Sequence, residues 1–323
     1  MTIPTIVSDA PLSGKIVTIL GGSGFVGRHL AQELLARGAR LRIASRHPKK
    51  AFAIKPLGNL GQVQFAGVDV TKAETLAAVL AGSDAVVNLV GAFAGDLDAL
   101  QGKGAGDIAA AAKAAGAGAF VHVSAIGADA GSDVAYARTK AEGEEAVRAA
   151  FPEATIVRPS LMFGPDDNFV NMFGELISRL PVLPVFAPQA KLQPVFVDDV
   201  AEAIANALGN VAAQGKTFEL AGPEVVTMIE LNERIAKAQG RSRSFAELPD
   251  AVSGLIAAAT GWLPGAPITS DQFKLLQAGS IAGGTVPGIT DLGVTPRPLG
   301  LFLDRWMVRF RKHGRFGAKT ANA

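Results

Sequence analysis

The sequence IVTILGGSGFVG, residues 16–27, joins an apolar run to a turn that contains four glycines. The apolar run predicts a buried strand, and the pattern from Phe25 onward predicts a helix directly after the turn. Gly21 and Gly24 let the backbone turn sharply and bring N–H groups close to a pyrophosphate, while Gly27 permits close helix packing. The order of strand, turn and helix predicts a dinucleotide-binding site, and the competing interpretation is an ordinary strand–helix turn.

The first half of the chain alternates apolar runs with helical patterns. After the glycine turn, Val26, Leu30 and Leu34 recur every four residues, and Gly38 follows as a helix stop. Nearly continuous apolar strands between helices predict a parallel sheet buried on both faces, with right-handed crossovers. The predicted fold class is α/β, a doubly wound parallel sheet of the NAD(P)-binding Rossmann type. The predicted strands are residues 15–20, 41–44, 63–66, 85–90, 120–123, 154–157, 194–197 and 217–220, and the predicted helices are residues 25–37, 108–115 and 136–150.

The second half loses this regular alternation. Four prolines between residues 165 and 188 punctuate short segments, which predicts an insertion that caps the sheet. The Gly- and Pro-rich stretch 249–298 suits a smaller lobe over the cofactor cleft. We therefore divide the chain into a Rossmann domain at residues 14–221, with residues 160–192 contributing to the cap, and a smaller C-terminal lobe at residues 222–323 that ends in a basic amphipathic helix.

Composition excludes several classes of protein. A chain of 323 residues with 49% hydrophobic content can bury a large core, and a net charge of only +2 does not favour a nucleic-acid partner. Without cysteine the chain has no disulfide, thiolate metal site or cysteine nucleophile. The four histidines lack ligand spacing, so we expect no metal site.

No stretch of the sequence favours a membrane span or an export signal. Every apolar run is interrupted before the roughly 18 residues that a span needs. Residues 1–14 lack the basic start and the apolar stretch of a secretory signal. We therefore expect a cytoplasmic protein, whose membrane contact would be peripheral and at the inner face of the cytoplasmic membrane.

The residues after the second predicted strand indicate which nucleotide binds. Sites for NAD usually carry an acidic residue about 20 positions after the glycines. Ser45 and Arg46 occupy this place instead, and the arginine can pair with the 2′-phosphate of NADP(H). Lys49 or Lys50 could assist it. We therefore predict NADPH rather than NADH, and the alternative is a solvated basic loop.

Tyr136 and Lys140 open a predicted helix, and Tyr136 is the only tyrosine in the chain. Residues four apart share one helix face, so the phenol and the ammonium can point into the same cleft. The ammonium would stabilise a tyrosinate and lower the pKa of the tyrosine towards a range useful for proton transfer. The pair predicts acid–base chemistry, against the alternative of a partly buried helix start.

With these features the chain resembles the atypical, extended short-chain dehydrogenase/reductases over nearly its whole length. Besides the glycine turn and the Tyr136/Lys140 pair, the resemblance lies in Ser124 and in residues 88–91, 158–165, 193–201 and 215–223. It implies Ser124, Tyr136 and Lys140 as the catalytic set. Strand ends carry the remaining contacts, since ligands of such sheets lie there. The predicted cofactor residues are Gly21, Ser23, Gly24, Phe25, Val26, Gly27, Ser45, Arg46, Asp69, Val70, Asn88, Val90, Gly91, Ser124, Tyr136, Lys140 and Pro159.

Within that superfamily the chain is most similar to the nucleotide-binding accessory subunit of respiratory complex I and its bacterial relatives. The similarity lies in residues 136–140 followed by 151–154, in the proline-rich stretch 163–197, and in residues 269–276 ahead of 292–296. It implies a tightly held NADPH with a structural or regulatory role, no established turnover, and a setting in complex I or quinone metabolism.

One departure from active relatives bears on catalysis. Active enzymes hold the substrate oxygen with a Ser or Thr in a serine-rich strand end, whereas here Ala125 and Ile126 follow Ser124. Without that donor the polarisation of a carbonyl weakens, although Tyr136 could still supply a proton. Three functions stay open: a structural NADPH holder, an active NADP-dependent reductase, dehydrogenase or epimerase on a small carbonyl or sugar-nucleotide substrate, and an NADP(H)-sensing regulator.

An apolar stripe at helical spacing lies near the end of the chain, with basic residues around it. Two explanations fit this pattern. It forms a basic surface that meets anionic lipid or a membrane-associated partner, or it packs on its own lobe with the basic residues in solvent. The stripe is Leu299, Phe302, Leu303, Trp306 and Phe310, and the basic residues are Arg305, Arg309, Arg311, Lys312 and Arg315.

Overall fold

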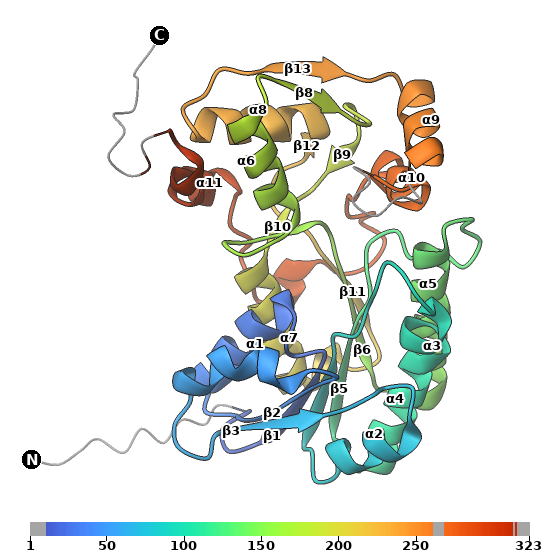
Figure 1. Cartoon of the computed structure of the whole chain (residues 1–323). Helices are drawn as coiled ribbons and strands as arrows, with labels where there is room; N and C mark the ends of the chain where they lie inside the picture. The colour runs from blue at the N-terminus through green and yellow to red at the C-terminus, as the bar shows by residue number, and fades with distance from the viewer. Residues whose placement is uncertain (1–10, 261–267, 313, 315–323) are drawn as a thin grey trace, which may run out of the picture.

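A computed structural model describes residues 11–260, 268–312 and 314, and Figure 1 shows how its helices and strands are arranged. Its centre is a seven-stranded sheet in the order β11-β6-β5-β4-β1-β2-β3. The strand pairs of this sheet are parallel, and the chain moves outward from β1 in both directions, which confirms the predicted doubly wound α/β class. The strands are β1 (Ile16–Leu20), β2 (Arg40–Ser45), β3 (Val63–Gly67), β4 (Ala85–Asn88), β5 (Ala119–Val123), β6 (Thr155–Pro159) and β11 (Thr217–Leu220).

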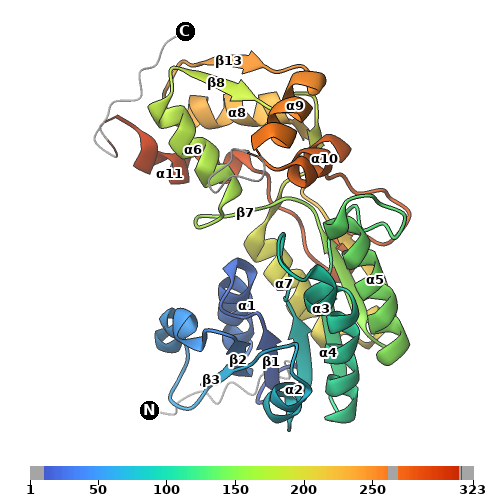
Figure 2. The same ribbon diagram turned by 45° about the vertical axis from the view of Figure 1, so that its right-hand side comes forward.

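Helices cover both faces of the sheet (Figures 1 and 2). On one face Leu30 of α1 and Ile204 of α7 belong to the same buried cluster as Ile19 of β1. On the other face Phe120 of β5 packs in a cluster with Ile108 of α4. Both faces are therefore removed from water, as the nearly continuous apolar strands predict. The covering helices are α1 (Phe25–Ala36), α7 (Val197–Gly209), α2 (Ala73–Leu80), α3 (Leu97–Gln101), α4 (Lys103–Ala114) and α5 (Ala135–Ala150).

Three local expectations differ from the structure. The fourth strand ends at Asn88, where the side chain accepts the N–H of Val90 and the chain leaves the sheet. Residues 194–197 form only the short strand β10 (Val195–Phe196), which α7 follows directly. The segment after β2 contains a 3₁₀ helix, η1 (Pro48–Leu57), that the loose spacing of its apolar residues did not indicate.

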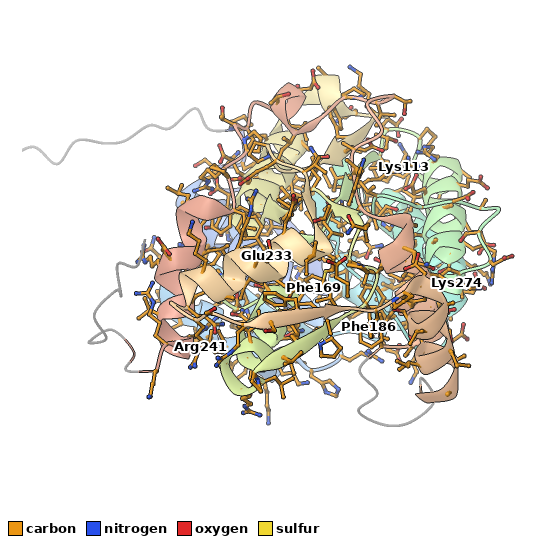
Figure 3. The ribbon with its side chains drawn as sticks, turned by 90° about the horizontal axis from the view of Figure 1, so that it is seen from above. Lys113, Phe169, Phe186, Glu233, Arg241 and Lys274 are labelled. Atoms are coloured by element: carbon orange, nitrogen blue, oxygen red, sulfur yellow. The ribbon has the colours of Figure 1, made fainter. Side chains whose placement is uncertain are left out.

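A cap lies over the carboxyl ends of the sheet strands, and Figure 3 looks down on it. It has its own apolar core, in which Phe163, Ile177, Leu231 and Phe273 are buried. The cap elements are β7 (Met162–Phe163), α6 (Phe169–Arg179), β8 (Val182–Val185), β9 (Lys191–Leu192), β12 (Val226–Thr227), α8 (Met228–Ala238), β13 (Ser244–Glu247), α9 (Asp250–Thr260), α10 (Ser270–Ala278), α11 (Gly300–Trp306) and η4 (Met307–Phe310), and two further 3₁₀ helices are η2 (Val211–Ala213) and η3 (Ile289–Leu292).

The chain passes repeatedly between the sheet domain and the cap. The cap core draws on residues 163–197, 226–273 and 299–307. Residues 200–220 pack in the core of the sheet domain, and so do Ile289, Leu292 and Val294 late in the chain. The division of the chain into two domains at residue 221 stays a prediction. The structure adds that Ile289, Leu292 and Val294, which lie after this boundary, pack in the core of the sheet domain.

The C-terminal apolar stripe packs into the cap. Leu299 and Leu303 are only 1% and 4% exposed. Phe302 stacks on Phe196 and on Trp306, with ring centroids 4.1 and 4.9 Å apart. The stripe therefore contributes to the core of its own lobe, which favours the second of the two explanations given for it.

The basic residues around this stripe divide into two groups. Arg309 and Arg311 donate hydrogen bonds to backbone carbonyl oxygens of the cap. Arg305 and Lys312 are exposed to solvent, and Arg315 lies outside the described residues. Within the described ranges, no helix is both long enough and apolar enough to cross a membrane.

Candidate dinucleotide site

The glycine turn connects the carboxyl end of β1 to α1. Gly21 has a φ of +77°, in the left-handed region that side chains rarely adopt, and its N–H donates to Ala44 O at 2.9 Å. Gly27 lies in the first turn of α1, where a Cβ atom would come within 2.5 Å of Gly22 O. The helix therefore packs against the turn at a separation that requires glycine.

The N-terminus of α1 offers N–H groups to an anion. Its N-cap residue is Gly24, which has no side chain to cap the first turn. The first amides of the helix, including those of Phe25 and Val26, have no acceptor within the helix. A pyrophosphate fits here for two reasons. It would accept hydrogen bonds from these amides and from the turn, which also contains Ser23, and the helix dipole would stabilise its negative charge.

Ser45 is the last residue of the neighbouring strand β2, and Arg46 follows it at the same edge of the sheet. Ser45 is 9% exposed, and its buried hydroxyl has no hydrogen-bond partner among the described residues. Arg46 is exposed, and the ion pairs found in residues 11–260, 268–312 and 314 do not include it. An unpartnered hydroxyl beside a free guanidinium fits a phosphate group on the adenosine ribose.

Asp69 and Val70 follow β3 and differ in what they can offer a ligand. Asp69 Oδ1 accepts hydrogen bonds from the N–H and the hydroxyl of Thr71, at 3.2 and 2.8 Å. These bonds, with smaller effects of Lys72 and Arg46, lower the pKa of the Asp69 carboxyl. The side chain of Val70 is 7% exposed and packs in the core, so any contact with adenine at this position is left to its backbone.

Asn88, at the end of β4, is fixed by two hydrogen bonds. Its Oδ1 accepts from the N–H of Val90 at 3.0 Å, and its Nδ2 lies 3.1 Å from His122 Nδ1. Because the amide nitrogen must donate, His122 carries its proton on Nε2. Burial, with the nearby charge of Lys140, lowers the pKa of His122 to about 3 and keeps the ring neutral. The sequence analysis missed His122, whose only signal is a polar residue inside an apolar strand.

Lys140 is buried where α5 meets the end of β5, with 4% of its surface exposed. Its Nζ donates to Val123 O at 3.0 Å, and Gly91 lies against it. Burial lowers the pKa of Lys140 to about 8, while the charge of Glu144 acts in the opposite direction. The ammonium is therefore held at the carboxyl edge of the sheet, next to the loop that follows β4.

Tyr136 is not activated in the way the sequence suggests. Burial raises the pKa of Tyr136 to about 12. Its ring stacks on Phe93, with the centroids 4.5 Å apart and an angle of 15° between the planes. Phe93 is itself 65% exposed and therefore lies between the phenol ring and solvent, so it shields one face of that ring. The expected lowering of the tyrosine pKa by Lys140 is therefore wrong for the protein alone, because burial is the dominant effect.

Ser124 and Pro159 lie at the ends of the adjacent strands β5 and β6. Ser124 is 3% exposed, and its hydroxyl has no hydrogen-bond partner among the described residues. Its N–H donates to Val157 O, and Pro159 O accepts the N–H of Ile126. The structure thus brings Ser124 and Pro159 to the same edge as the glycine turn, and a buried hydroxyl without a partner fits a ligand group.

Gln101 connects the loop after β4 to the helix that carries Lys140. It is fully buried. Its Oε1 accepts the N–H of Ala92 and its Nε2 donates to Thr139 Oγ1, each at 3.0 Å. The loop that holds Phe93 is therefore tied to α5. Sequence reasoning missed this glutamine, because one polar residue in a helical pattern does not distinguish a tie from a solvent-exposed position.

A charged cluster joins α1 to the cap, and it too was missed. His29 Nδ1 lies 2.5 Å from Asp198 Oδ1, and His29 Nε2 lies 3.0 Å from Asp166 Oδ1. Arg28 also donates to Asp166. Burial alone would lower the pKa of His29, but the hydrogen bonds and charges of the two carboxylates raise it overall.

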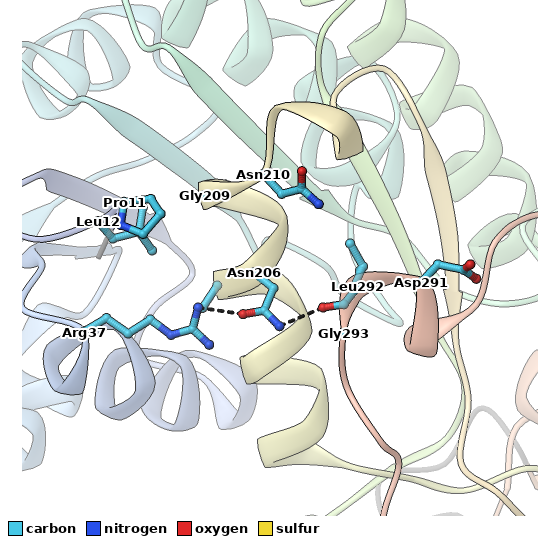
Figure 4. Close-up of a pocket in the computed structure, with 10 residues that line it drawn as sticks. Pro11, Leu12, Arg37, Asn206, Gly209, Asn210, Asp291, Leu292 and Gly293 are labelled. Carbon is cyan, nitrogen blue, oxygen red and sulfur yellow. Dashed lines mark hydrogen bonds between the residues drawn. The ribbon is translucent and has the colours of Figure 1, made fainter. Parts of the chain in front are cut away.

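Two cavities lie among the described residues: the smaller lies beside this edge of the sheet, and the larger lies away from it. The smaller, of about 220 Å³, lies between α1, η1 and the loop after β7. The larger, of about 570 Å³, lies where α1 and α7 end (Figure 4). In it Arg37 donates to Asn206 Oδ1 and Asn206 donates to Leu292 O, so these groups are satisfied within the protein. The described residues contain no group of three histidines or carboxylates that could hold a metal ion.

Two protein families match the chain. The family described as NAD(P)H-binding matches residues 21–174, which contain the glycine turn and the strands β2 to β6. The family described as RmlD substrate binding domain matches residues 129–256, which contain α5 and much of the cap. The chain therefore carries an NAD(P)H-binding domain, and most of the strand ends described above belong to it.

Individual proteins resemble the chain over most of its length. The mitochondrial NADH dehydrogenase (ubiquinone) 1 alpha subcomplex subunit 9 of Rattus norvegicus is 33% identical over 300 residues, which are 90% of this chain and 79% of the relative. Ceramide reductase of Caulobacter vibrioides is 33% identical over 190 residues, 58% of each chain. The NADPH-dependent quinone oxidoreductase QOR2 of Escherichia coli, complexed with NADPH, has the same fold, with a TM-score of 0.70 at 19% identity over 89% of this chain and 98% of that chain. These matches confirm the resemblance indicated by the sequence motifs.

Proposed function

Because this chain belongs to the family of the mitochondrial NADH dehydrogenase (ubiquinone) 1 alpha subcomplex subunit 9, we propose that it holds NADP(H) as a structural or regulatory group. In this proposal the chain turns over little or no substrate. The observation that carries it is the state of Tyr136, whose ring is stacked under Phe93 and whose pKa is raised to about 12. A phenol in that state is a poor proton donor at neutral pH.

Other features of the site support a held nucleotide. The uncapped N-terminus of α1 and the unpartnered hydroxyls of Ser45 and Ser124 are groups that a bound ligand would complete. Ala125, which follows Ser124, cannot polarise a substrate carbonyl. Arg46 supports NADPH over NADH, since its guanidinium is free to pair with a 2′-phosphate.

The same proposal extends to partner and location. The subunit 9 relative named above belongs, by its name, to an NADH dehydrogenase (ubiquinone), and we propose respiratory complex I as the partner of this chain. The protein would then be cytoplasmic and peripheral, at the inner face of the cytoplasmic membrane. Co-purification with the tagged chain at native expression would test this, and recovery of the chain free of complex I subunits would argue against it.

The role of the nucleotide is tested with Tyr136→Phe, which removes only the phenolic oxygen. We expect the variant to copurify with as much NADPH as the wild type and to have the same free energy of unfolding. Gly27→Ala, which places a methyl group against the glycine turn, serves as the control that loses nucleotide. Loss of NADPH from Tyr136→Phe to the same extent as from the control would show that the phenolic oxygen is needed to hold the nucleotide, which would count against the proposal.

A second candidate function is an active NADP-dependent reductase. It is favoured by the ceramide reductase relative and by Tyr136 and Lys140 four residues apart on α5. Movement of Phe93 off the phenol would be needed for it. NADPH oxidation by the wild type with a carbonyl acceptor, lost by about 10²-fold or more in Tyr136→Phe, would establish this candidate and exclude the first.

A further inference from the structure

The segment between β2 and β3 carries positive charge without a balancing negative charge. From residue 46 to residue 68 the sequence contains no Asp or Glu. Lys49, Lys50 and Lys55 are exposed, and the ion pairs of the described ranges include none of them. Asp166, which lines a cavity together with Ile54 and Leu57 of η1, is already paired with Arg28 and His29. The elements that pack most closely on η1 are α1, β2 and β3. Their one acidic residue, Glu33, is ion-paired with Arg37.

The same segment exposes three large apolar side chains. Phe52 is 50% exposed, Leu57 is 52% exposed and Leu60 is 106% exposed. Their backbone is nevertheless anchored, because Ala51 and Ile54 on the opposite side of η1 are 0% and 1% exposed and belong to the sheet core. Phe52 and Leu57 are therefore presented to solvent by a fixed helix, and Leu60 lies in the turn that follows it. In Figure 2 this helix, drawn in blue, projects beside α1 from the edge of the sheet that ends in β3.

Free lysines beside exposed apolar side chains are the combination that an anionic bilayer binds. The ammonium groups are attracted to acidic headgroups, and the apolar side chains leave water for the boundary of the acyl chains. We propose that the η1 surface, defined as Lys49, Lys50, Phe52, Lys55, Leu57 and Leu60, docks the protein peripherally on an anionic lipid bilayer. The C-terminal stripe is less available for this role, because Leu299 and Leu303 are buried in the cap and the aromatic side chains of the stripe are partly buried against it.

Two variants separate the charged and the apolar parts of this surface. Lys50→Gln combined with Lys55→Gln removes two charges, whereas Leu60→Ser removes an apolar side chain that no other residue covers. Lys49 is left unchanged, because it lies only three residues after Arg46 in the sequence. The matched control, Arg305→Gln with Lys312→Gln, removes two exposed charges from the C-terminal stripe instead.

Binding is measured by co-sedimentation of the full chain, saturated with NADPH, with vesicles of phosphatidylcholine and phosphatidylglycerol. We expect the double lysine variant to bind about 25-fold more weakly, since each lysine near such a surface contributes about fivefold. We expect Leu60→Ser to bind roughly tenfold more weakly, because it no longer buries a leucine. Added salt should weaken wild-type binding and have less effect on the double lysine variant. The control should bind like the wild type.

Several outcomes would overturn the proposal. Equal binding of the wild type to pure phosphatidylcholine vesicles would remove the role of charge, and no binding to the anionic vesicles would remove the surface altogether. An unchanged affinity of either η1 variant would contradict the joint role of lysines and leucine. A loss in the control as large as in the double lysine variant would assign binding to the C-terminal stripe. Because Lys50 could also assist Arg46 at the 2′-phosphate, NADPH retention is measured for both η1 variants. Lys55→Gln alone, which leaves the predicted cofactor residues unchanged, should bind the anionic vesicles about fivefold more weakly, and an unchanged affinity would contradict the role of this lysine.

Discussion

Replacement of Gly27 by alanine is the most direct test of how the cofactor cradle is built. A Cβ atom at this position would lie 2.5 Å from Gly22 O and 2.6 Å from Gly22 C and Cα. These are backbone atoms, so no side chain can rotate away to make room. The helix and the turn would have to separate by roughly the shortfall from ordinary van der Waals contact, which is about 1 Å.

The expected loss of stability follows from two opposed effects. Overpacking of a site without slack costs up to about 3 kcal/mol. Alanine also favours the helix over glycine by about 1 kcal/mol, which offsets part of that cost. We therefore expect Gly27→Ala to lower the free energy of unfolding by about 2 kcal/mol. NADPH should bind at least about tenfold more weakly, because the displaced turn would lose one or more hydrogen bonds to the charged pyrophosphate.

Urea unfolding and fluorescence titration with NADPH measure the two effects separately. Gly254→Ala in α9 is the matched control, because it is also a helical glycine but a Cβ there would meet its nearest atom at an ordinary 3.5 Å. We expect this control to gain up to about 1 kcal/mol of stability and to bind NADPH normally. If Gly27→Ala were as stable as the wild type and bound NADPH as tightly, the close approach of α1 to the turn would not be what fixes the cradle.

Three further predictions address other parts of the molecule. Arg46→Ala should weaken NADPH binding by about tenfold while NADH binding is unchanged in parallel titrations, because the charge-assisted bond to a 2′-phosphate is lost; equal losses for both nucleotides would refute this role. Glu144→Gln should lower the free energy of unfolding by about 3 kcal/mol in urea, because it removes the buried negative charge that pairs with Arg158 and Arg148; a change near zero would show that this charge does not stabilise the fold. Despite burial, the pKa of His29 is raised by its hydrogen bonds to Asp166 and Asp198. These bonds therefore stabilise the fold fully below pH 6.5, and this stability is lost as the pH rises through the raised pKa. His29→Gln should remove that slope from urea unfolding measured across the range, and a slope equal to the wild type's would contradict the assignment.

The fold was largely predictable because its signals are local and repeated. Strand β1, the glycine turn and α1 each depend on residues next to one another, and the apolar runs recur through β5 with helical patterns between them. The helix η1 was not predictable, because Ala51 and Ile54 are held by contacts with the distant sheet core and not by a helical period of their own. The placement of the C-terminal stripe could not be predicted for a similar reason. Its apolar residues indicate that another surface covers them, but they do not indicate whether that surface is the cap, a lipid or a partner.

The candidate site shows the same limit at the scale of side chains. Gly21, Arg46 and Lys140 could be predicted as site residues because their residue types at the ends of strands or on one helix face point to nucleotide chemistry. His122 was not found, because its significance arises from a hydrogen bond to Asn88 on another strand. The raised pKa of Tyr136 could not be predicted either, because burial raises it and burial is a property of the assembled fold.

The repeated passage of the chain between the sheet domain and the cap has a consequence for how the cleft can open. Because the cap core draws on three separate stretches of chain, the last of them at residues 299–307, no single linker joins the two lobes. Opening must therefore be spread over several connections as small sliding shifts, not concentrated in a rotation about one hinge. During synthesis, the core of the sheet domain is complete only after residues 289–294 have left the ribosome, and the core of the cap only after residues 299–307. Both lobes are therefore completed late, and a nucleotide can be enclosed between them only after that.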